Sequence, residues 1–211
     1  GIYIFDRDVL ESYLKADAKD EKSEHDFGKN VIPTMLADQV PLYAYPFEGY
    51  WKDVGTIDSL WQANMEVLEP THSGINLIDE NWKIYSRNSG MTGHKIGSNA
   101  VVENCMITDG CRIDGNVKHS ILFSGVRVEK GAKIEDAVVM GKTVIKAGAV
   151  VEHCIVAENV VIGENAVVGS MPKGEEHGVA TIGSGITIGK GAKIGPSAMV
   201  NKNVEDGEEQ W

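Results

Sequence analysis

The sequence predicts a short α/β segment followed by a left-handed parallel β-helix. Aliphatic residues recur close to every six positions from about Ile96 onward, whereas residues 1–70 mix helical and strand-like periods. The residues between these regions are rich in Gly, Ser and Asn, which favour turns. We therefore expect an α/β domain over residues 1–70, a linker over 71–93 and the β-helix over 94–211.

Four windows of nine residues carry the β-helix prediction. They begin at Cys105, Ser120, Ala137 and Cys154 and read CMITDGCRI, SILFSGVRV, AVVMGKTVI and CIVAENVVI, with starts 15, 17 and 17 residues apart. The second, third and ninth places are aliphatic or Met in every window. This spacing approaches three hexapeptides, one triangular coil in which aliphatic residues point inward and stack on their counterparts in the next coil.

Two kinds of residue are expected at the corners of the coils. Gly183-Ser184-Gly185 and Gly189-Lys190-Gly191 resemble phosphate-binding loops, but they lack the GxxxxGK[ST] pattern and recur at the six-residue period. His119 and His153 lie within the repeats, and we expect both side chains to be exposed at corners.

Residues 1–70 read as alternating strands and helices. The apolar patterns predict strands at 2–5 and 40–47 and helices at 9–14, 31–36 and 57–68. Asp8 and Thr56 are the expected N-caps of the first and last of these helices. This is too little α/β material for a complete nucleotide-binding sheet.

Composition excludes several classes of partner. The formal net charge of −11 and the isoelectric point near 5.0 leave no basic stripe for nucleic acid or an anionic membrane. No apolar run reaches about 18 residues, and no charged and then apolar stretch precedes a cleavage signal, so we expect neither a membrane span nor secretion. Cys105, Cys111 and Cys154 lack CxxC spacing. We therefore expect buried thiols in a reducing cytoplasm, without zinc or disulfides.

The segment FEGYWKDVGT, residues 47–56, ends a predicted strand and opens a predicted capped helix. Ligands of α/β sheets bind at such carboxyl ends. Asp53 is its candidate metal ligand, since Mg²⁺ takes one or two carboxylates together with phosphate oxygens. The alternative is that Asp53 only satisfies amides of the turn.

Four strings, GIYIF, HDFGKNVIP, GYWKDVGT and SLWQANM, stand in this order ahead of the hexapeptide repeats. In this arrangement the chain resembles the bacterial glucose-1-phosphate adenylyltransferases, over essentially its whole length. The resemblance implies the C-terminal part of a Rossmann-like nucleotidyltransferase domain joined to the β-helix. It also implies attack of a glucose 1-phosphate oxygen on the α-phosphorus of ATP, which gives ADP-glucose and pyrophosphate for glycogen synthesis.

Matched residue by residue, Asp53 takes the place of the family's catalytic, Mg²⁺-binding aspartate. Tyr3, Asp26, Phe27 and Trp51 fall where the family lines the glucose 1-phosphate pocket. An aromatic ring can cover a sugar face, and a carboxylate can accept sugar hydroxyl protons. The alternative from the residues alone is core packing for the aromatic side chains and a helix cap for Asp26.

The sequence departs from the family in extent. The family's glycine-rich GGxGTRL-type loop, its first metal-binding aspartate and its phosphate-binding lysine would precede Gly1, which opens a strand-like run without an initiator Met. We therefore expect a chain that begins within a fold and does not make ADP-glucose by itself. The family's β-helix contributes to tetramer contacts and to a site for sugar-phosphate or related effectors, so a homo-oligomer is expected.

Two other functions remain open at this stage. A hexapeptide-repeat acyltransferase would use a general-base histidine on a polar loop, and His177 is the candidate. A non-catalytic regulatory subunit of the same family would keep the fold but lose catalytic carboxylates. The presence of Asp53 and of the HDFGK string favours the catalytic type.

Overall fold

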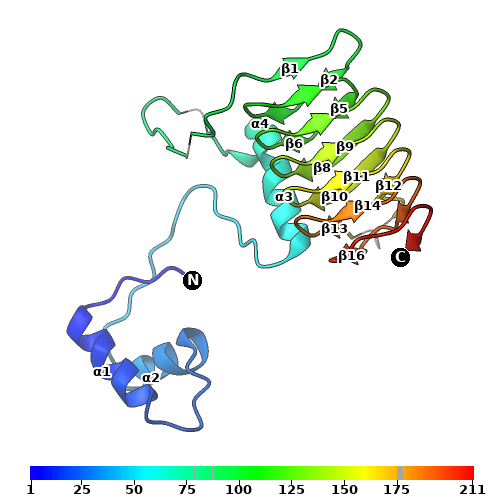
Figure 1. Ribbon diagram of the computed structural model, residues 1–211. Coiled ribbons are helices and arrows are strands. Elements are labelled where there is room, and N and C mark those ends of the chain that lie inside the picture. Colours follow the sequence, from blue (N-terminus) through cyan, green and yellow to red (C-terminus); the bar gives the residue numbers. More distant parts are fainter. Residues whose placement is uncertain (78, 87, 175–177) are drawn as a thin grey trace. The chain divides into compact units, whose positions relative to one another are not determined.

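The computed structural model describes residues 1–77, 79–86, 88–174 and 178–211 (Figure 1). These residues form two compact units, Gly1–Glu48 and Gly49–Trp211, which we describe separately. In the described part of the chain, no helix has the length and apolar character needed to cross a membrane.

The unit Gly1–Glu48 contains three short helices. They are α1 (Arg7–Asp17), the π-helix η1 (Phe27–Val31) and α2 (Ile32–Ala37). The predicted cap of the first helix was wrong, because the side chain of Asp6, not Asp8, accepts hydrogen bonds from the backbone N–H groups of Asp8 and Val9. Asp8 lies in the first turn, where its negative charge interacts favourably with the positive end of the helix dipole.

The two strands predicted in this unit are absent. Residues 1–6 and 40–48 belong to no strand or helix, although their apolar patterns are strand-like. A strand is stabilised by the ladder it forms with a neighbour, and the unit contains no other strand to pair with. The apolar pattern therefore indicated a local preference for extended backbone, but no neighbouring strand is present in the unit to form a sheet with it.

The second unit opens with an irregular segment that leads into helix α3 (Ile57–Leu68), followed by the single turn α4 (Pro70–Ser73). The predicted cap Thr56 is confirmed. Its side chain accepts from the backbone N–H of Ser59, and the Ser59 hydroxyl accepts from the N–H of Thr56 in return. This reciprocal capping box fixes where the irregular segment ends and the helix begins.

Among the residues that the structure describes, seventeen short strands build the parallel β-helix from Lys95 onward. They are β1 (Lys95–Ile96), β2 (Val102–Glu103), β3 (Met106–Ile107), β4 (Arg112–Ile113), β5 (Asn116–Lys118), β6 (Ile121–Leu122), β7 (Arg127–Val128), β8 (Lys133–Val139), β9 (Val144–Ile145), β10 (Val150–Val156), β11 (Val161–Ile162), β12 (Val167–Val168), β13 (Ala180–Ile182), β14 (Thr187–Ile188), β15 (Lys193–Ile194), β16 (Met199–Val200) and β17 (Glu209–Gln210).

The strands stack coil upon coil into three faces, which confirms the predicted β-helix (Figure 1). One face has the order β1-β4-β7-β9-β11-β14, and a second has β2-β5-β8-β10-β12-β15-β17. The third is formed by β3, β6, β13 and β16 together with the later halves of β8 and β10, which bend around a corner and so serve two faces. All these pairs are parallel, and the four superposed sequence windows lie in register.

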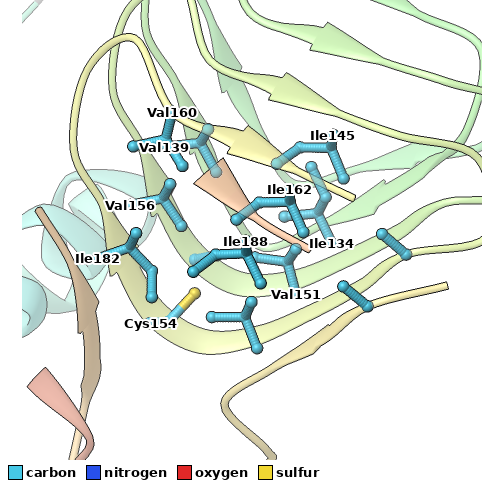
Figure 2. Close-up of a cluster of buried hydrophobic side chains, with 14 of the residues drawn as sticks. Ile134, Val139, Ile145, Val151, Cys154, Val156, Val160, Ile162, Ile182 and Ile188 are labelled. Carbon is cyan, nitrogen blue, oxygen red and sulfur yellow. The ribbon is translucent and has the colours of Figure 1, made fainter. Parts of the chain in front are cut away.

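The core of the β-helix is built from the inward positions of the repeat. The ninth places of the four windows, Ile113, Val128, Ile145 and Ile162, are each at most 1 % exposed. Figure 2 shows Ile145 and Ile162 in one buried cluster with Val139 and Val156, which hold the third places of their windows. No single coil could bury these side chains alone, so the stack is the unit of stability.

The second places of the windows point outward and form what we call the outward strip: Met106, Ile121, Val138 and Ile155. Helix α3 covers this strip, with Met65 buried among its side chains and Trp61 packed against it. Aliphatic residues are suitable at these outward positions because helix α3, rather than water, lies against them. Contacts therefore group α3 with the β-helix, whereas the predicted domain boundary at residue 70 groups it with the catalytic domain and stays a prediction.

The corners are marked by residues with positive φ, including Gly185 and Gly191 of the two glycine repeats, as predicted. His119 and His153 also occupy corners, with φ of 41° and 44°. The predicted exposure was wrong for His153, which is 7 % exposed because the ring of Trp61 packs against its imidazole at 4.3 Å. His119 is half-buried.

The cysteines are free thiols, as expected. Cys111 and Cys154 are buried and Cys105 is partly buried. Burial raises the pKa of each of the three thiols, most strongly that of Cys154. The thiols therefore stay protonated at neutral pH and act as small apolar core residues.

Candidate functional site

The predicted site residues divide between the two units. Tyr3, Asp26 and Phe27 lie in Gly1–Glu48, and Trp51 and Asp53 lie in Gly49–Trp211. Each group is therefore built up from its own surroundings.

In the first unit, the structure brings Tyr3 and Phe27 together. Their rings stack with centroids 5.8 Å apart and planes inclined by 16°. Phe5, which sequence reasoning did not single out, packs on both, with its ring centroid 5.9 Å from that of Tyr3 and 5.8 Å from that of Phe27. The signal for Phe5 was its place two residues after Tyr3, since both then lie on one face of an extended segment.

Asp26 precedes Phe27 and caps the π-helix. Its Oδ1 accepts hydrogen bonds of 2.8 Å from the backbone N–H groups of Gly28 and Lys29. The role of helix cap, which was the alternative for this residue, is therefore present. Oδ2 accepts no hydrogen bond from the described residues, so the same carboxylate keeps an oxygen for another donor.

In the second unit, Asp53 is exposed and forms a tight turn with its neighbours. Its Oδ1 accepts a 3.1 Å hydrogen bond from the backbone N–H of Gly55. Among the described residues, Oδ2 has no hydrogen-bond or ion-pair partner. One oxygen thus satisfies a turn amide, and the other is available.

The residues that alternate with Trp51 and Asp53 are held by helix α3. The Tyr50 hydroxyl donates to Glu66 Oε2 at 2.6 Å, and Lys52 Nζ donates to Glu66 Oε1 at 2.6 Å. Trp51 lies between them and is 57 % exposed. We call these two hydrogen bonds to Glu66 the tether. The sequence did not predict them, because no local pattern pairs residues that are 14 and 16 positions apart.

The electrostatics of this tether keep it intact at neutral pH. Hydrogen bonds from Lys52 and Tyr50 lower the pKa of Glu66, so its carboxylate stays ionised. Desolvation and the neighbouring Glu66 raise the pKa of Tyr50 to about 12, so its hydroxyl stays a donor. The tether is therefore lost only below the ordinary pKa of a glutamate or in strong alkali.

Helix α3 is in turn fixed to the β-helix by polar contacts as well as by the outward strip. The indole Nε1 of Trp61 donates to the carbonyl oxygen of Asp136 at 2.7 Å. At the start of the helix, Asp58 Oδ1 accepts from the backbone N–H of Val179 at 3.3 Å. The segment that carries Asp53 therefore belongs mechanically to the β-helix unit.

As a site for Mg²⁺, this chain offers one suitable ligand. The described residues contain no group of three or more His, Cys, Asp or Glu side chains placed to hold a metal ion. Asp53 presents one free, exposed carboxylate oxygen, which fits an ion that takes one or two protein carboxylates and completes its shell with substrate phosphates and water. His177, the candidate base of the acyltransferase alternative, lies outside the described residues.

Comparison with known proteins finds similarity to two families along the chain. Residues 1–70 match the nucleotidyl transferase family, and residues 89–189 match the family of GlmU-like, C-terminal hexapeptide domains.

Among curated proteins, the chain is 52 % identical to the glucose-1-phosphate adenylyltransferases of Bacillus cereus and Bacillus mycoides, over 132 residues that make up 63 % of this chain and 35 % of each relative. It is also 52 % identical to the enzyme of that name from Clostridium botulinum, over 62 % of this chain and 33 % of the relative. The chain thus spans about a third of the length of these relatives.

Proposed function

Because this chain is similar to the glucose-1-phosphate adenylyltransferases, as its motifs predicted, we propose that it supplies the sugar-phosphate side of such an enzyme. In this proposal Asp53 is the catalytic and Mg²⁺-binding carboxylate. Tyr3, Asp26, Phe27 and Trp51 contact glucose 1-phosphate. The β-helix carries the segment that holds Trp51 and Asp53.

The observation that carries the proposal is the alternation along residues 50–53. Tyr50 and Lys52 are committed to Glu66, whereas Trp51 and Asp53 are left exposed, with an aromatic face and a carboxylate oxygen unoccupied by the protein. A segment that only joined two elements would gain by burying a tryptophan. Rigid support behind an exposed ring and carboxylate is the arrangement that binding and positioning require.

The proposed reaction joins two charged substrates. A phosphate oxygen of glucose 1-phosphate attacks the α-phosphorus of ATP, the bond between the α- and β-phosphates breaks, and pyrophosphate leaves. Catalysis of this kind consists mainly of positioning and charge neutralisation. The Trp51 ring would lie on the apolar face of the sugar, and Asp26 Oδ2 would accept a hydrogen bond from a sugar hydroxyl.

Mg²⁺, when bound at Asp53, would supply positive charge that neutralises the phosphates. The turn made by the Gly55 amide holds the carboxylate in one orientation, which lowers the entropy cost of binding the ion. The 211 residues contain no glycine-rich GGxGTRL-type loop, so we propose that this polypeptide alone does not release pyrophosphate.

An anionic effector is proposed at three cations on the first face of the β-helix. Lys95, Arg112 and Arg127 occupy register partners in successive coils, are exposed, and form no ion pair with described residues. Like charges placed opposite one another are destabilising. A sugar phosphate should therefore raise the melting temperature of the chain. Arg112→Gln should abolish that rise, whereas Lys202→Gln should not.

We propose self-association for the β-helix, because the strands of its last coil have an edge that pairs with no further strand among the described residues. Sedimentation velocity should show an oligomer. A strict monomer at all concentrations would contradict this proposal.

The function is tested with a chimaera in which this chain replaces the segment that it matches in the Bacillus cereus relative. We expect the chimaera to form ADP-glucose, and Trp51→Ala to raise the KM for glucose 1-phosphate about tenfold or more. Trp82→Ala, which removes an indole that is even more exposed than that of Trp51, is the control and should leave KM unchanged. An active chimaera with the same KM in all three forms would contradict the role of Trp51.

A further inference from the structure

We infer that Glu66 is a positioning residue for the segment 50–56. From helix α3 it accepts hydrogen bonds from Tyr50 and Lys52, and it thereby fixes the positions of Trp51 and Asp53. This inference rests on the proposed function. Glu66 lies outside every motif that identified the site, in the second half of a helix whose apolar stripe suggested only packing.

Both oxygens of Glu66 are used, each by a different side chain. Oε2 accepts from the Tyr50 hydroxyl and Oε1 from Lys52 Nζ, each at 2.6 Å. The side chains of Lys52 and Glu66 are 22 % and 25 % exposed, so the ion pair is largely shielded from water. Charge-assisted hydrogen bonds of this length are about twice as strong as neutral ones.

The two bonds bracket Trp51. With residues 50 and 52 fixed on one side of the segment, the side chain of residue 51 must project to the other, and Asp53 follows directly. The far end of the segment is fixed by the capping box of Thr56. The stretch from Tyr50 to Thr56 is therefore anchored at both ends on the same helix.

The helix itself is a firm base for this anchor. Met65, the residue before Glu66, is 5 % exposed where it packs against the outward strip, and Trp61 is hydrogen-bonded to the β-helix. The position of Asp53 thus follows the β-helix through α3 and Glu66. A carboxylate that must meet a metal ion gains from such support, because an error of about 1 Å in placement can cost about a hundredfold in rate.

Glu66 is not a further metal ligand or general base. Both of its oxygens are occupied, and its pKa is lowered rather than raised towards neutrality. Its effect on the reaction passes through its neighbours. If Glu66 only stabilised the fold, its replacement would leave the exchange of residues 50–55 and the kinetic constants unchanged. If it positions the segment, both should change.

The first test measures the segment directly. Hydrogen exchange of residues 50–55 is followed in the 211-residue chain for Glu66→Ala and Glu66→Gln. Glu164→Ala is the control, since it removes an exposed ion pair with Lys190 on the β-helix. We expect about tenfold faster exchange in Glu66→Ala, a smaller rise in Glu66→Gln, which keeps a hydrogen-bonding amide, and no change in the control. Unchanged exchange in Glu66→Ala would overturn the inference.

The second test measures the consequence in the chimaera with the Bacillus cereus relative. Glu66→Ala should raise the KM for glucose 1-phosphate and the Mg²⁺ concentration for half-maximal rate by about tenfold, with partial rescue in Glu66→Gln. Exchange in the β-helix serves as the check that the fold is intact. Faster exchange at residues 50–55 with unaltered kinetic constants would overturn the positioning role. A chimaera without any activity would overturn the proposed function instead, and the exchange data distinguish the two failures.

Discussion

The β-helix and the unit Gly1–Glu48 both have apolar sequence patterns that predict strands, but they bury their apolar side chains to very different extents. In the β-helix, the core runs through successive coils, with residues such as Ile145 and Ile188 fully buried. In Gly1–Glu48, only Val31 and Met35 are buried, while Ile4 is 99 % exposed. Helix α1 buries none of its residues.

The difference teaches that a repeated sequence supplies the neighbouring strands with which each of its strands pairs. Each β-helix strand finds its neighbour one coil away in the same sequence, so a local pattern suffices to build the structure. An isolated strand pattern such as residues 40–47 has to meet a strand from elsewhere, and the unit supplies none. The predictions below test this contrast, beginning with the β-helix, where the largest effects are expected.

Truncating a side chain of the stacked core should have the largest effect. Ile162→Ala removes a fully buried side chain and should lower the free energy of unfolding by about 4 kcal/mol, since the surrounding coils cannot collapse into the cavity. Val161→Ala, at the adjacent outward position, is the matched control and should cost about 1 kcal/mol or less. Urea unfolding followed by circular dichroism measures both; equal losses would show that the inward row does not dominate stability.

A corner glycine tests how closely the coils approach. A β-carbon on Gly163 would lie 2.6 to 2.7 Å from backbone atoms of Gly189, Ile188 and Lys190 in the next coil. Gly163→Ala should therefore cost about 3 kcal/mol by forcing the coils apart. Gly93→Ala, where the new methyl group meets open space, should be nearly neutral. Thermal unfolding that is identical for the two variants would contradict the close approach.

The attachment of helix α3 is tested at Trp61. Trp61→Phe keeps an aromatic ring against the outward strip but leaves the Asp136 carbonyl without its donor, which should cost about 2 kcal/mol. Trp82→Phe, at a 79 % exposed indole, is the control. If unfolding and hydrogen exchange of α3 are the same in both variants, the hydrogen bond from Trp61 to Asp136 does not contribute to the attachment of the helix.

The smallest effect is expected in Gly1–Glu48, at the cap of α1. Asp6→Ala removes the acceptor for two backbone N–H groups and should destabilise the helix by about 1 kcal/mol. Asp8→Ala should cost less, because Asp8 contributes only its charge in the first turn. Amide exchange in residues 7–17 distinguishes them, and a larger loss from Asp8→Ala would restore the cap that the sequence suggested.

Much of the fold could be predicted, because its determinants are local. The inward row that includes Ile113 and Val128 followed from the spacing, and the Thr56 cap followed from the residue type. The outward direction of Ile121 could not be predicted, since it depends on α3 lying over the strip. The burial of His153 depends on the same helix.

The candidate site divides in the same way. Asp53 and Trp51 were found through a motif of adjacent residues, and the Asx-type turn at Asp53 was foreseen as an alternative. Glu66 was missed because its partners, Tyr50 and Lys52, are brought to it only when the segment folds back on α3. Motifs thus locate the groups that touch a ligand, whereas the groups that hold them in place emerge from the packing.

The proposed role of Asp53 is tested most directly by its isosteric amide. In the chimaera with the Bacillus cereus relative, Asp53→Asn keeps the oxygen that accepts from Gly55 but removes the charge. We predict a loss of ADP-glucose synthesis of about a hundredfold or more at saturating substrates, only partly recovered by raising Mg²⁺, and no loss in the exposed control Asp20→Asn. Full activity of Asp53→Asn, with an unchanged requirement for Mg²⁺, would contradict the account.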